Sequence, residues 1–541
     1  MTSSCVNIIT SAAYVNQELA AEFGLIPPSF LPLGTGRLFE IQVKNFRKNL
    51  IENSPIYLTL PDSFIVTPYD KHTLKEKGVV IVSVPDDMSL GNSLVYTINV
   101  INAYNSNIRI LHGDTILDDI PQEMDIIASY PDGDDYSWAV INQADDKYIK
   151  NLETIKSTKD ENNYRPVACG YFSFSKGNEL IKSLCQARGN FIEGINLYNK
   201  HQPLKINAIK NWYDFGHIQT YFQSRRLVTT ARAFNSLQIT SNTVKKISSD
   251  SFKMLAEAEW LESTPPNLKP FTARLFEYGQ DNDKTFYSTE YQYTPTLAEL
   301  FVFSDIGKAT WNKILASCTD FLNLCAKQKG KKKRDDYTAH LVGNKTFERL
   351  KLFSNQTGFN IMHDLVFNGN KYPSLLTIAN NLSDFITKNP EELCTIMHGD
   401  FCFSNILYNS RNRRITVIDP RGYVFPHIKE NYGDLRYDMA KLSHSINGLY
   451  DFIITGRYNL INNNQYDFEL TFDLSSSHKW LQTYFNKINI ANITVSSKEI
   501  QAMTIALFLS MLPLHADRPD RQKAFIANAL RLYSIFEERK D

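Results

Sequence analysis

The stretch TIMHGDFCFSNILYNSRNRRITVIDPRGY at residues 395–423 decides the fold of the C-terminal half. An apolar lead-in ends in the triplet HGD at 398–400, and Asn405 stands five residues after its aspartate. A polar turn then leads into an expected strand at 415–418, which delivers Asp419. Phosphoryl transfer needs one carboxylate that accepts a hydroxyl proton, and an amide and a second carboxylate that hold magnesium. The stretch therefore predicts a phosphoryl-transfer site with oxygen ligands for Mg²⁺.

The same stretch has a structural interpretation, in which a buried histidine lies in a turn and an aspartate caps a helix. A lone HGD triplet would favour that interpretation, because short triplets often arise by chance. The combination of HGD, an asparagine five residues later and a strand that ends in aspartate is far more specific. We therefore favour the phosphoryl-transfer interpretation.

These residues resemble the aminoglycoside phosphotransferase and choline kinase family, a branch of the protein-kinase-like fold. The resemblance implies that Asp400 is the catalytic base and that Asn405 and Asp419 are metal ligands. It also implies that His398 braces the catalytic loop. This sequence reads IDPRG where many members have an aromatic or acidic residue after ID. Arg421 is thus a candidate catalytic residue that grips a phosphate or an anionic substrate, or else it pairs with a nearby carboxylate.

The segment YGDLRYDMAKLSHS at residues 432–445 is also similar to this family, which places a helix start with an aspartate after the metal loop. The resemblance implies that Asp434 and Asp438 cap the helix and brace the loop, and that neither takes part in the chemistry.

A kinase also needs a small lobe, in which a strand lysine holds the nucleotide phosphates and a helix glutamate pairs with it. The segment TVKKISSDSFKMLAEAEWL at residues 243–261 fits this requirement. Adjacent strand residues point to opposite faces, so only Lys245 or Lys246 faces the nucleotide. We choose Lys246, which shares a face with Val244, and Glu257 as its partner. Which lysine faces the nucleotide stays open.

The strand expected at residues 284–291 would lead into a hinge, where backbone groups near Glu290 and Tyr291 hold the adenine of ATP. The sequence has no GxGxxG loop, which this family usually lacks as well. From Ile306 onward the pattern is mostly helical and would form the large lobe and the acceptor pocket. Long helices are expected there at residues 311–327, 375–388 and 500–537.

The first 220 residues alternate short apolar runs with helical patterns such as residues 38–50 and 93–104. Strands that alternate with helices predict a parallel sheet covered by helices on both faces. Ligands bind such sheets beyond the carboxyl ends of the strands. The expected strands are residues 6–10, 56–60, 79–84 and 108–112.

Five segments of this half resemble the sugar-nucleotide pyrophosphorylase family, which transfers a nucleotidyl group from an NTP to a sugar or alcohol phosphate. They are PPSFLPLGTGRLFE at 27–40, PDDMSLGNSLVYTI at 85–98, HGDT at 112–115, ACGYFSF at 168–174 and NWYDFGH at 211–217. The resemblance implies that Asp114 and Asp214 hold Mg²⁺ against the α-phosphate. It also implies that Gly91 and Asn92 meet the bound NTP, with CTP and UTP as candidates.

This half also departs from the family. The first loop, TSAAYVNQELA at residues 10–20, lacks the glycines that cradle a triphosphate. Ser29 stands where the family has a lysine, and Arg37 is a candidate substitute for the missing charge. Lys156 or Lys159 is a candidate for a later lysine of the family. These departures favour a degenerate N-terminal site as the alternative to an active one.

The chain of 541 residues is long enough for about three or four domains. We expect a nucleotidyltransferase-like domain at 1–230, a kinase-like small lobe at 231–300 and a helical large lobe at 301–541. The fold class is thus α/β and α+β, with a Rossmann-like domain built on a mixed sheet before a bilobal kinase-like domain. The charges balance at 58 basic and 58 acidic residues, which argues against a nucleic-acid partner.

Seven scattered cysteines without a CxxC pair, no signal peptide and no membrane span predict a reduced, cytoplasmic protein.

We expect a bifunctional enzyme, in which an ATP-dependent kinase acts on a sugar or amino alcohol and a nucleotidyltransferase makes an NDP-activated precursor. The expected setting is capsule, lipopolysaccharide or other surface polysaccharide. Alternatives are a kinase with a degenerate N-terminal binding module, and an inactive interaction protein. The binding partners expected for the enzyme are nucleotides and a small hydroxylated or phosphorylated metabolite. The sequence leaves open whether the protein forms a homo-oligomer.

Overall fold

The computed structural model divides the chain into two compact units. Unit 1 comprises Met1–Leu227 with Phe303–Asp305, and unit 2 comprises Val228–Val302 with Ile306–Asp541. Lys156 and Lys159 lie outside the described residues. The structure describes residues 5–49, 54–131, 138–155, 166–230, 237–281, 284–330, 337–388 and 394–538.

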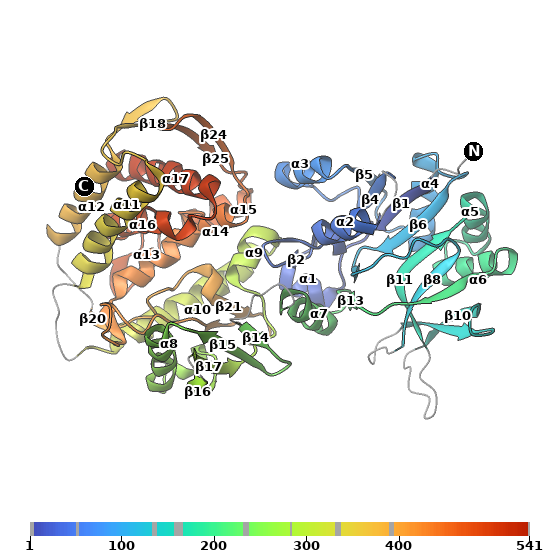
Figure 1. The fold of residues 1–541 in the computed structure, drawn as a ribbon, viewed down its shortest axis with the longest axis horizontal. Coiled ribbons are helices and arrows are strands. Elements are labelled where there is room, and N and C mark those ends of the chain that lie inside the picture. The colour runs from blue at the N-terminus through green and yellow to red at the C-terminus, as the bar shows by residue number, and fades with distance from the viewer. Residues whose placement is uncertain are drawn as a thin grey trace. The chain divides into compact units, whose positions relative to one another are not determined.

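Unit 1 is built on a mixed sheet (Figure 1). The four expected strands are confirmed and pair in parallel: β1 (Cys5–Thr10), β4 (Ile56–Pro61), β5 (Val79–Val84) and β6 (Asn107–His112). β11 (Val167–Phe174) pairs antiparallel with β6 and is buried along its whole length. The sheet order is β10-β9-β11-β6-β1-β4-β5, with β8 beside β11 and β12 beside β8. The other bounds are β8 (Ile126–Tyr130), β9 (Trp138–Gln143), β10 (Ile149–Ile155) and β12 (Lys205–Ala208).

The helices of unit 1 pack their apolar residues onto this sheet. Leu94 and Ile98 of α4 (Leu90–Val100) are fully buried with the sheet residues Ile8 and Ile110 in one core. The expected helix at 93–104 was placed too late, because the Ser89 hydroxyl caps the N-terminus of α4. The remaining helices are α1 (Gln17–Phe23), α2 (Leu38–Asn49), α3 (Pro68–Glu76), α5 (Gly177–Gln186), α6 (Phe191–His201) and α7 (Ile218–Thr230).

A short two-stranded ribbon carries both aspartates expected in unit 1. β7 (Thr115–Leu117) follows Asp114 directly, and β13 (Trp212–Asp214) ends at Asp214. The two strands pair antiparallel, and Thr115 is the partner of Asp214. Residues about 100 positions apart in the sequence are thereby brought side by side.

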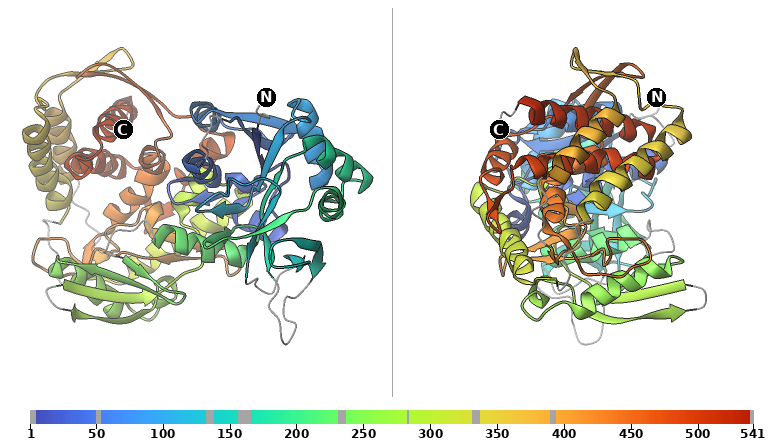
Figure 2. Two further views of the ribbon diagram at one scale, coloured as in Figure 1. Left: turned by 45° about the vertical axis from the view of Figure 1, so that its right-hand side comes forward. Right: turned by 90° about the vertical axis from the view of Figure 1, so that its left-hand side faces the viewer.

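Unit 2 begins with a small antiparallel sheet and one long helix (Figure 2, green). The sheet order is β14-β15-β17-β16, and α8 (Ser251–Ser263) follows β15. Trp260 of α8 is fully buried and donates from Nε1 to the Met397 carbonyl at 2.8 Å, which joins the small lobe to the large one. The strands are β14 (Leu237–Ile239), β15 (Thr243–Ser248), β16 (Leu275–Asp281) and β17 (Lys284–Glu290).

The rest of unit 2 is mainly helical, and α16 (Lys498–Met511) is buried on almost every side. The single helix expected at 500–537 is wrong: α16 ends before a short turn, and α17 (Pro519–Glu538) follows. Pro513 and Pro519 lack the backbone N–H that a continuous helix needs. The other helices longer than seven residues are α10 (Lys308–Lys327), α11 (Lys345–Thr357), α12 (Leu375–Lys388), α13 (Leu435–Ile446) and α15 (Ser476–Phe485).

A four-stranded sheet in the large lobe was not expected from the sequence. Its order is β19-β18-β25-β24, and its strands have only three to six residues. Asparagine-rich runs such as NLINNN lack the apolar alternation that predicts a strand. The strands are β18 (Leu365–Phe367), β19 (Asn370–Tyr372), β24 (Asn459–Asn464) and β25 (Asp467–Thr471).

The fold class expected from the sequence is confirmed, with a mixed-sheet α/β unit followed by a bilobal unit of a small sheet and a helical lobe. Among the described residues, we find no helix with both the length and the apolar character needed to span a membrane.

Candidate active site

The HGD triplet forms a loop between β20 (Cys394–Ile396) and the short turn Phe403–Asn405. The fully buried Asp438 accepts hydrogen bonds from the backbone N–H groups of His398 at 2.6 Å and Gly399 at 2.8 Å. Burial raises the pKa of Asp438 to about 7, although these two hydrogen bonds oppose the shift. Asp438 of α13 therefore holds the backbone of the loop, as expected from the sequence.

Asp400 is held from two sides at the mouth of a cavity. Lys441 Nζ lies 2.8 Å from Asp400 Oδ1, and Asn405 Nδ2 donates to Asp400 Oδ2 at 2.9 Å. Enclosure alone would raise the pKa of Asp400, but the Lys441 ammonium outweighs it and holds the pKa below its usual range. The Asp400 side chain is 41% exposed, so an ionised carboxylate of fixed orientation faces the cavity.

His398 lies behind this loop and not in the cavity wall. The residue has no exposed surface, and burial lowers the pKa of its imidazole to about 4. Its Nδ1 accepts from the backbone N–H of Asp400 at 3.3 Å, and its ring packs edge-on against Trp260. A neutral imidazole in this place positions the loop and is not suited to exchange protons with a substrate.

The small lobe contributes an ion pair that also reaches the large lobe. Lys246 Nζ lies 2.7 Å from Glu257 Oε2 and 3.3 Å from Asp419 Oδ1. Tyr287 Oη donates to Glu257 at 2.9 Å and lies 3.2 Å from Asp419 Oδ1. Lys245 points to the other face, with its Nζ 3.7 Å from the centre of the Phe286 ring. The structure thus places Lys246, and not Lys245, in the cleft.

Asp419 and Asn405 line the same cavity, which has a volume of about 310 Å³. Because Asn405 Nδ2 is bound to Asp400, its side-chain oxygen remains for a cation. Asp419 has a φ of 55°, so its carboxylate leaves the strand β22 (Arg414–Val417) at a sharp turn, 44% exposed. Oxygen donors of this kind fit Mg²⁺. Three or more His, Cys, Asp or Glu side chains do not gather around any one point in the part of the chain described.

Gly422 anchors the turn that presents Asp419, which leads to a stability prediction. Its φ is 66°, and a Cβ there would lie 2.1 Å from the Ala256 carbonyl oxygen. We expect Gly422→Ala to lower the free energy of unfolding by about 2 kcal/mol or more, because backbone strain and a clash with α8 add up. Gly307→Ala is the control, since nothing lies within 4 Å of a Cβ there. Urea melts of both variants measure the effect, and equal stability of the two would contradict it.

Arg421 sits against the HGD loop. Its backbone N–H donates to the His398 carbonyl at 2.8 Å, and its guanidinium lies 4.7 Å from the centre of the Tyr423 ring. Within the described ranges, no carboxylate comes within 4.0 Å of this guanidinium. The structure thus shows no carboxylate partner for Arg421, and its side chain lines the cavity.

The expected hinge residues lie at the end of β17, away from the triplet. The backbone N–H of Glu290 donates to the Arg274 carbonyl, and that of Tyr291 donates to the Asn242 carbonyl, both at 2.9 Å. These two donors are therefore already used within the small lobe.

Several side chains of the cavity were not found from the sequence. Lys441 stands three residues after Asp438 on α13, and this spacing would have placed both on one helix face. Tyr287 lies on β17 opposite Lys246, so strand pairing would have found it. Lys345 and Arg349 come from α11, and no sequence signal links that helix to the triplet.

In unit 1, Asp114 and Asp214 face each other. A Cβ on Gly216 would lie 2.7 Å from Asp114 Oδ2 and 3.3 Å from Asp214 Oδ1. Burial and then the Asp214 charge raise the pKa of Asp114 to about 6. His217 Nδ1 lies 3.6 Å from Asp214 Oδ2, and the nearby Asp214 carboxylate raises the pKa of His217. A buried and a half-buried carboxylate that repel each other fit a divalent cation.

This repulsion predicts the effect of Asp114→Asn. A raised carboxyl pKa means that the folded state loses stability as the pH rises from about 4 to 6. We therefore expect the variant to be more stable than the parent by about 1–3 kcal/mol at pH 7.5 without metal, and not at pH 4. Stabilisation by Mn²⁺ should be lost. Thermal melts with Asp119→Asn, an exposed control, measure both effects, and a less stable Asn variant at pH 7.5 would contradict the prediction.

Other residues were also singled out in unit 1. Gly91 and Asn92 lie in the first turn of α4 and pack against Gly189, where a Cβ would lie 2.2 Å from Asn92 Oδ1. Arg37 is buried and bound to Asp70 at 3.1 Å, so the expectation that it replaces the missing loop charge is wrong.

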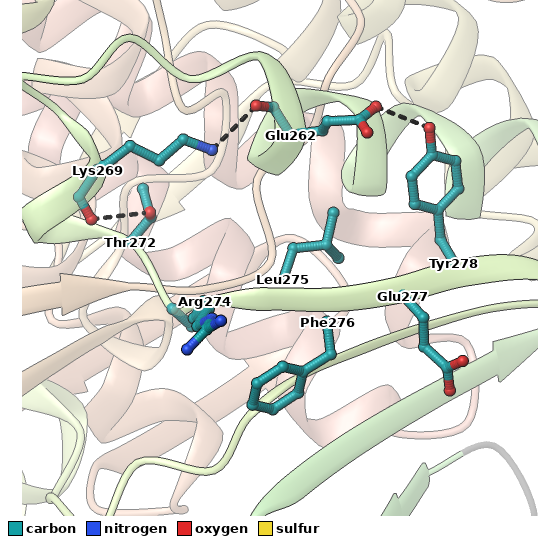
Figure 3. A pocket seen from close by; sticks show the side chains of 9 residues that line it. Glu262, Lys269, Thr272, Arg274, Leu275, Phe276, Glu277 and Tyr278 are labelled. Atoms are coloured by element: carbon teal, nitrogen blue, oxygen red, sulfur yellow. Dashed lines mark hydrogen bonds between the residues drawn. The ribbon is translucent and has the colours of Figure 1, made fainter.

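A second hollow of about 540 Å³ lies in unit 2 along β16 (Figure 3). Lys269 donates to the Glu262 carbonyl at 2.9 Å, and the Glu262 carboxylate accepts from Tyr278 Oη at 2.7 Å. None of the expected site residues lines this hollow.

Comparison with known proteins gives structural likenesses alone. No family model matches the chain, and no curated protein matches it. A UTP-bound UGPase from Acinetobacter baumannii is 14% identical, with a TM-score of 0.34, and covers 43% of this chain and 95% of its own. HddC from Yersinia pseudotuberculosis, complexed with GMP-PN, is 13% identical, with a TM-score of 0.30, over 42% of this chain and 100% of its own.

A thermostable mutant of aminoglycoside phosphotransferase APH(4)-Ia is 13% identical, with a TM-score of 0.34, and covers 58% of this chain and 98% of its own. These structures come from the two classes that the sequence resembles. Identities of 13–14% and TM-scores of 0.30–0.34 do not indicate an activity for this chain. Its function is therefore inferred from its own side chains.

Proposed function

We propose that unit 2 is an ATP-dependent phosphotransferase that phosphorylates a hydroxyl group of a small metabolite. One observation carries the proposal: the Lys246–Glu257–Asp419 network and the Asp400–Asn405 pair open onto one cavity. These are the groups that phosphoryl transfer requires, and they come from both lobes.

In this proposal each residue has a defined task. Asp400, oriented by Lys441 and Asn405, accepts the proton of the acceptor hydroxyl as that oxygen attacks the γ-phosphorus. Lys246, held by Glu257, binds the α- and β-phosphates. Asn405 and Asp419 would hold Mg²⁺, which neutralises the charge that develops on the phosphate oxygens.

The adenine would be bound just beyond β17. The backbone N–H groups of Gln292 and Tyr293 have no acceptor among the described residues, whereas those of Glu290 and Tyr291 are used. We assign the adenine donor to Gln292 or Tyr293, with the Glu290 carbonyl as an acceptor for the base.

A coupled assay of ADP release tests this function. Full-length protein with ATP and Mg²⁺ is offered sugars, choline, ethanolamine and glycerate, and at least one acceptor should give release that stops when EDTA removes the metal. Release of ADP from none of them, together with no binding of Mg–ATP, would contradict the proposal.

For unit 1 we propose nucleotidyl transfer to a phosphorylated compound, with CTP or UTP as candidate donors. The facing carboxylates of Asp114 and Asp214 support it. The two activities would then make an NDP-activated precursor in the cytoplasm for capsule, lipopolysaccharide or another surface polysaccharide. Pyrophosphate release from an NTP and a sugar 1-phosphate tests the step, and release that survives in an Asp114→Ala, Asp214→Ala double variant would contradict it.

A second candidate for unit 1 is a degenerate domain that binds a nucleotide or a phosphate without transfer. The loop at 10–20 has no glycine, and Arg37 is locked to Asp70. Binding of UTP or CTP without any pyrophosphate release would favour this candidate.

A further inference from the structure

The cavity of unit 2 that contains Asp400 and Asp419 has more basic than acidic side chains. Its basic side chains are Lys246, Lys253, Lys345, Arg349, Arg421 and Lys441, and its carboxylates are Glu257, Asp400 and Asp419. The carboxylates lie against three of the basic groups, because Glu257 contacts both Lys246 and Lys253 and Asp400 contacts Lys441.

Three basic side chains of the cavity have no carboxylate partner among the described residues. No carboxylate oxygen of the described residues comes within 4.0 Å of the side-chain nitrogens of Lys345, Arg349 or Arg421. Lys345 Nζ donates to the Tyr437 hydroxyl at 3.5 Å and lies 5.9 Å from the centre of that ring, and Arg349 Nη1 donates to the Ser510 carbonyl at 2.9 Å. Such a cluster is unfavourable unless an anion joins it, since like charges repel strongly in a partly desolvated cavity.

The three basic side chains line the same cavity. Lys345 and Arg349 are one turn apart on α11, so both project from the same helix face. Burial lowers the pKa of Lys345 well below its ordinary value, and the charges of Arg421 and Arg349 lower it further. Arg421 packs against Gly399, which precedes Asp400. The cluster is therefore next to the carboxylate that would take the hydroxyl proton.

We propose that Lys345, Arg349 and Arg421 form an acceptor subsite for a phosphate or carboxylate group, so that the substrate is a hydroxyl compound that already carries an anion. The inference rests on the proposed kinase function of the same cavity. Two guanidinium groups and the Lys345 amine, which a bound anion would keep protonated, match the oxygens of such a group in charge and in hydrogen-bond donors. Choline, amino sugars and other cationic acceptors would be repelled by it.

A titration with inorganic phosphate tests the subsite without knowledge of the acceptor. The full chain is first saturated with Mg–AMP-PNP, so that the nucleotide site is occupied. Its melting temperature is then measured at increasing concentrations of phosphate. Chloride at equal ionic strength is the reference. We expect a phosphate-specific rise in the parent protein and an about tenfold higher half-saturating phosphate concentration in Arg349→Leu. Arg349→Lys should recover part of the affinity.

Lys351→Leu is the matched control, because Lys351 is an exposed lysine of the same helix. Its phosphate response should equal that of the parent. Absence of any phosphate-specific rise, or an equal loss in Lys351→Leu and Arg349→Leu, would overturn the subsite.

Matched acceptors give the second arm. Glycerate is compared with glycerol, and glucose 6-phosphate with glucose, by coupled ADP release, with choline as the cationic member. An anionic member should be used at least about tenfold more efficiently than its neutral partner, and Arg349→Leu should raise the KM of that acceptor but not of ATP.

The outcomes separate this inference from the proposed function. Preference for a neutral or cationic acceptor, with ADP release that still depends on Asp400, overturns the subsite and keeps the kinase. A rise in the KM of ATP alone in Arg349→Leu assigns the three cations to the nucleotide and overturns the subsite as well. If no acceptor in the panel is phosphorylated, the phosphate titration alone decides.

Discussion

We expect Asp400→Asn to remove nearly all ADP release from the protein, with kcat reduced by about 10³-fold and the KM of ATP little changed. A general base contributes about 10²–10⁴-fold to proton transfer, and the amide of asparagine does not accept a proton at neutral pH. In the proposed mechanism Asp400, itself held by Lys441 and Asn405, would also orient the attacking hydroxyl. Initial rates of ADP release against the acceptor found in the panel measure the effect.

The variant leaves Lys441 without its carboxylate partner, so its fold must be checked separately. Binding of Mg–ADP, followed by calorimetry, should match the parent because Asp400 faces the acceptor side. Asp473→Asn, at an exposed position of the same lobe, is the control and should keep full activity. Full turnover in a folded Asp400→Asn protein would remove Asp400 as the base.

Lys246→Met should lower kcat/KM for ATP by about 100-fold or more. The methionine keeps the length of the side chain but removes the charge that holds the phosphates, and the loss of one such electrostatic contact costs about 10²–10³ in rate. Removal of the ammonium also leaves the buried Glu257 without its 2.7 Å partner. Steady-state rates at varied ATP measure the loss.

The adjacent residue provides a close control. Lys245→Met changes the same type of side chain one position earlier, where Nζ lies over the Phe286 ring and away from the cavity. We expect its kcat/KM to stay within about a factor of two of the parent, since loss of one half-buried cation–π contact outside the cavity affects stability slightly. An effect of equal size in the two variants would contradict the assignment of Lys246.

Local sequence was sufficient where one segment contains its own structural signal. The strand Val79–Val84 and the helix Leu375–Lys388 have the expected bounds, because apolar runs and helical periodicity are local properties. Asp400, Asn405 and Asp419 were also singled out from one local segment, and the structure places all three around one cavity.

Residues that depend on tertiary packing were not found. Lys345 and Arg349 reach the cavity only because α11 packs on α16, and that contact is between segments 150 residues apart. Arg37 looked like a phosphate ligand from its place in a loop, yet the fold buries it against Asp70. In both cases the environment of the side chain is set by contacts between segments far apart in the sequence, which residue type alone does not reveal.

A structure of the full chain with Mg²⁺ and AMP-PNP tests the central claim most directly. We predict a metal ion about 2.1 Å from oxygens of Asp419 and Asn405, with the γ-phosphate directed toward Asp400 and Lys246 on the inner phosphates. A nucleotide bound outside this cavity, or Asp419 still paired with Lys246 and no metal beside it, would contradict the account.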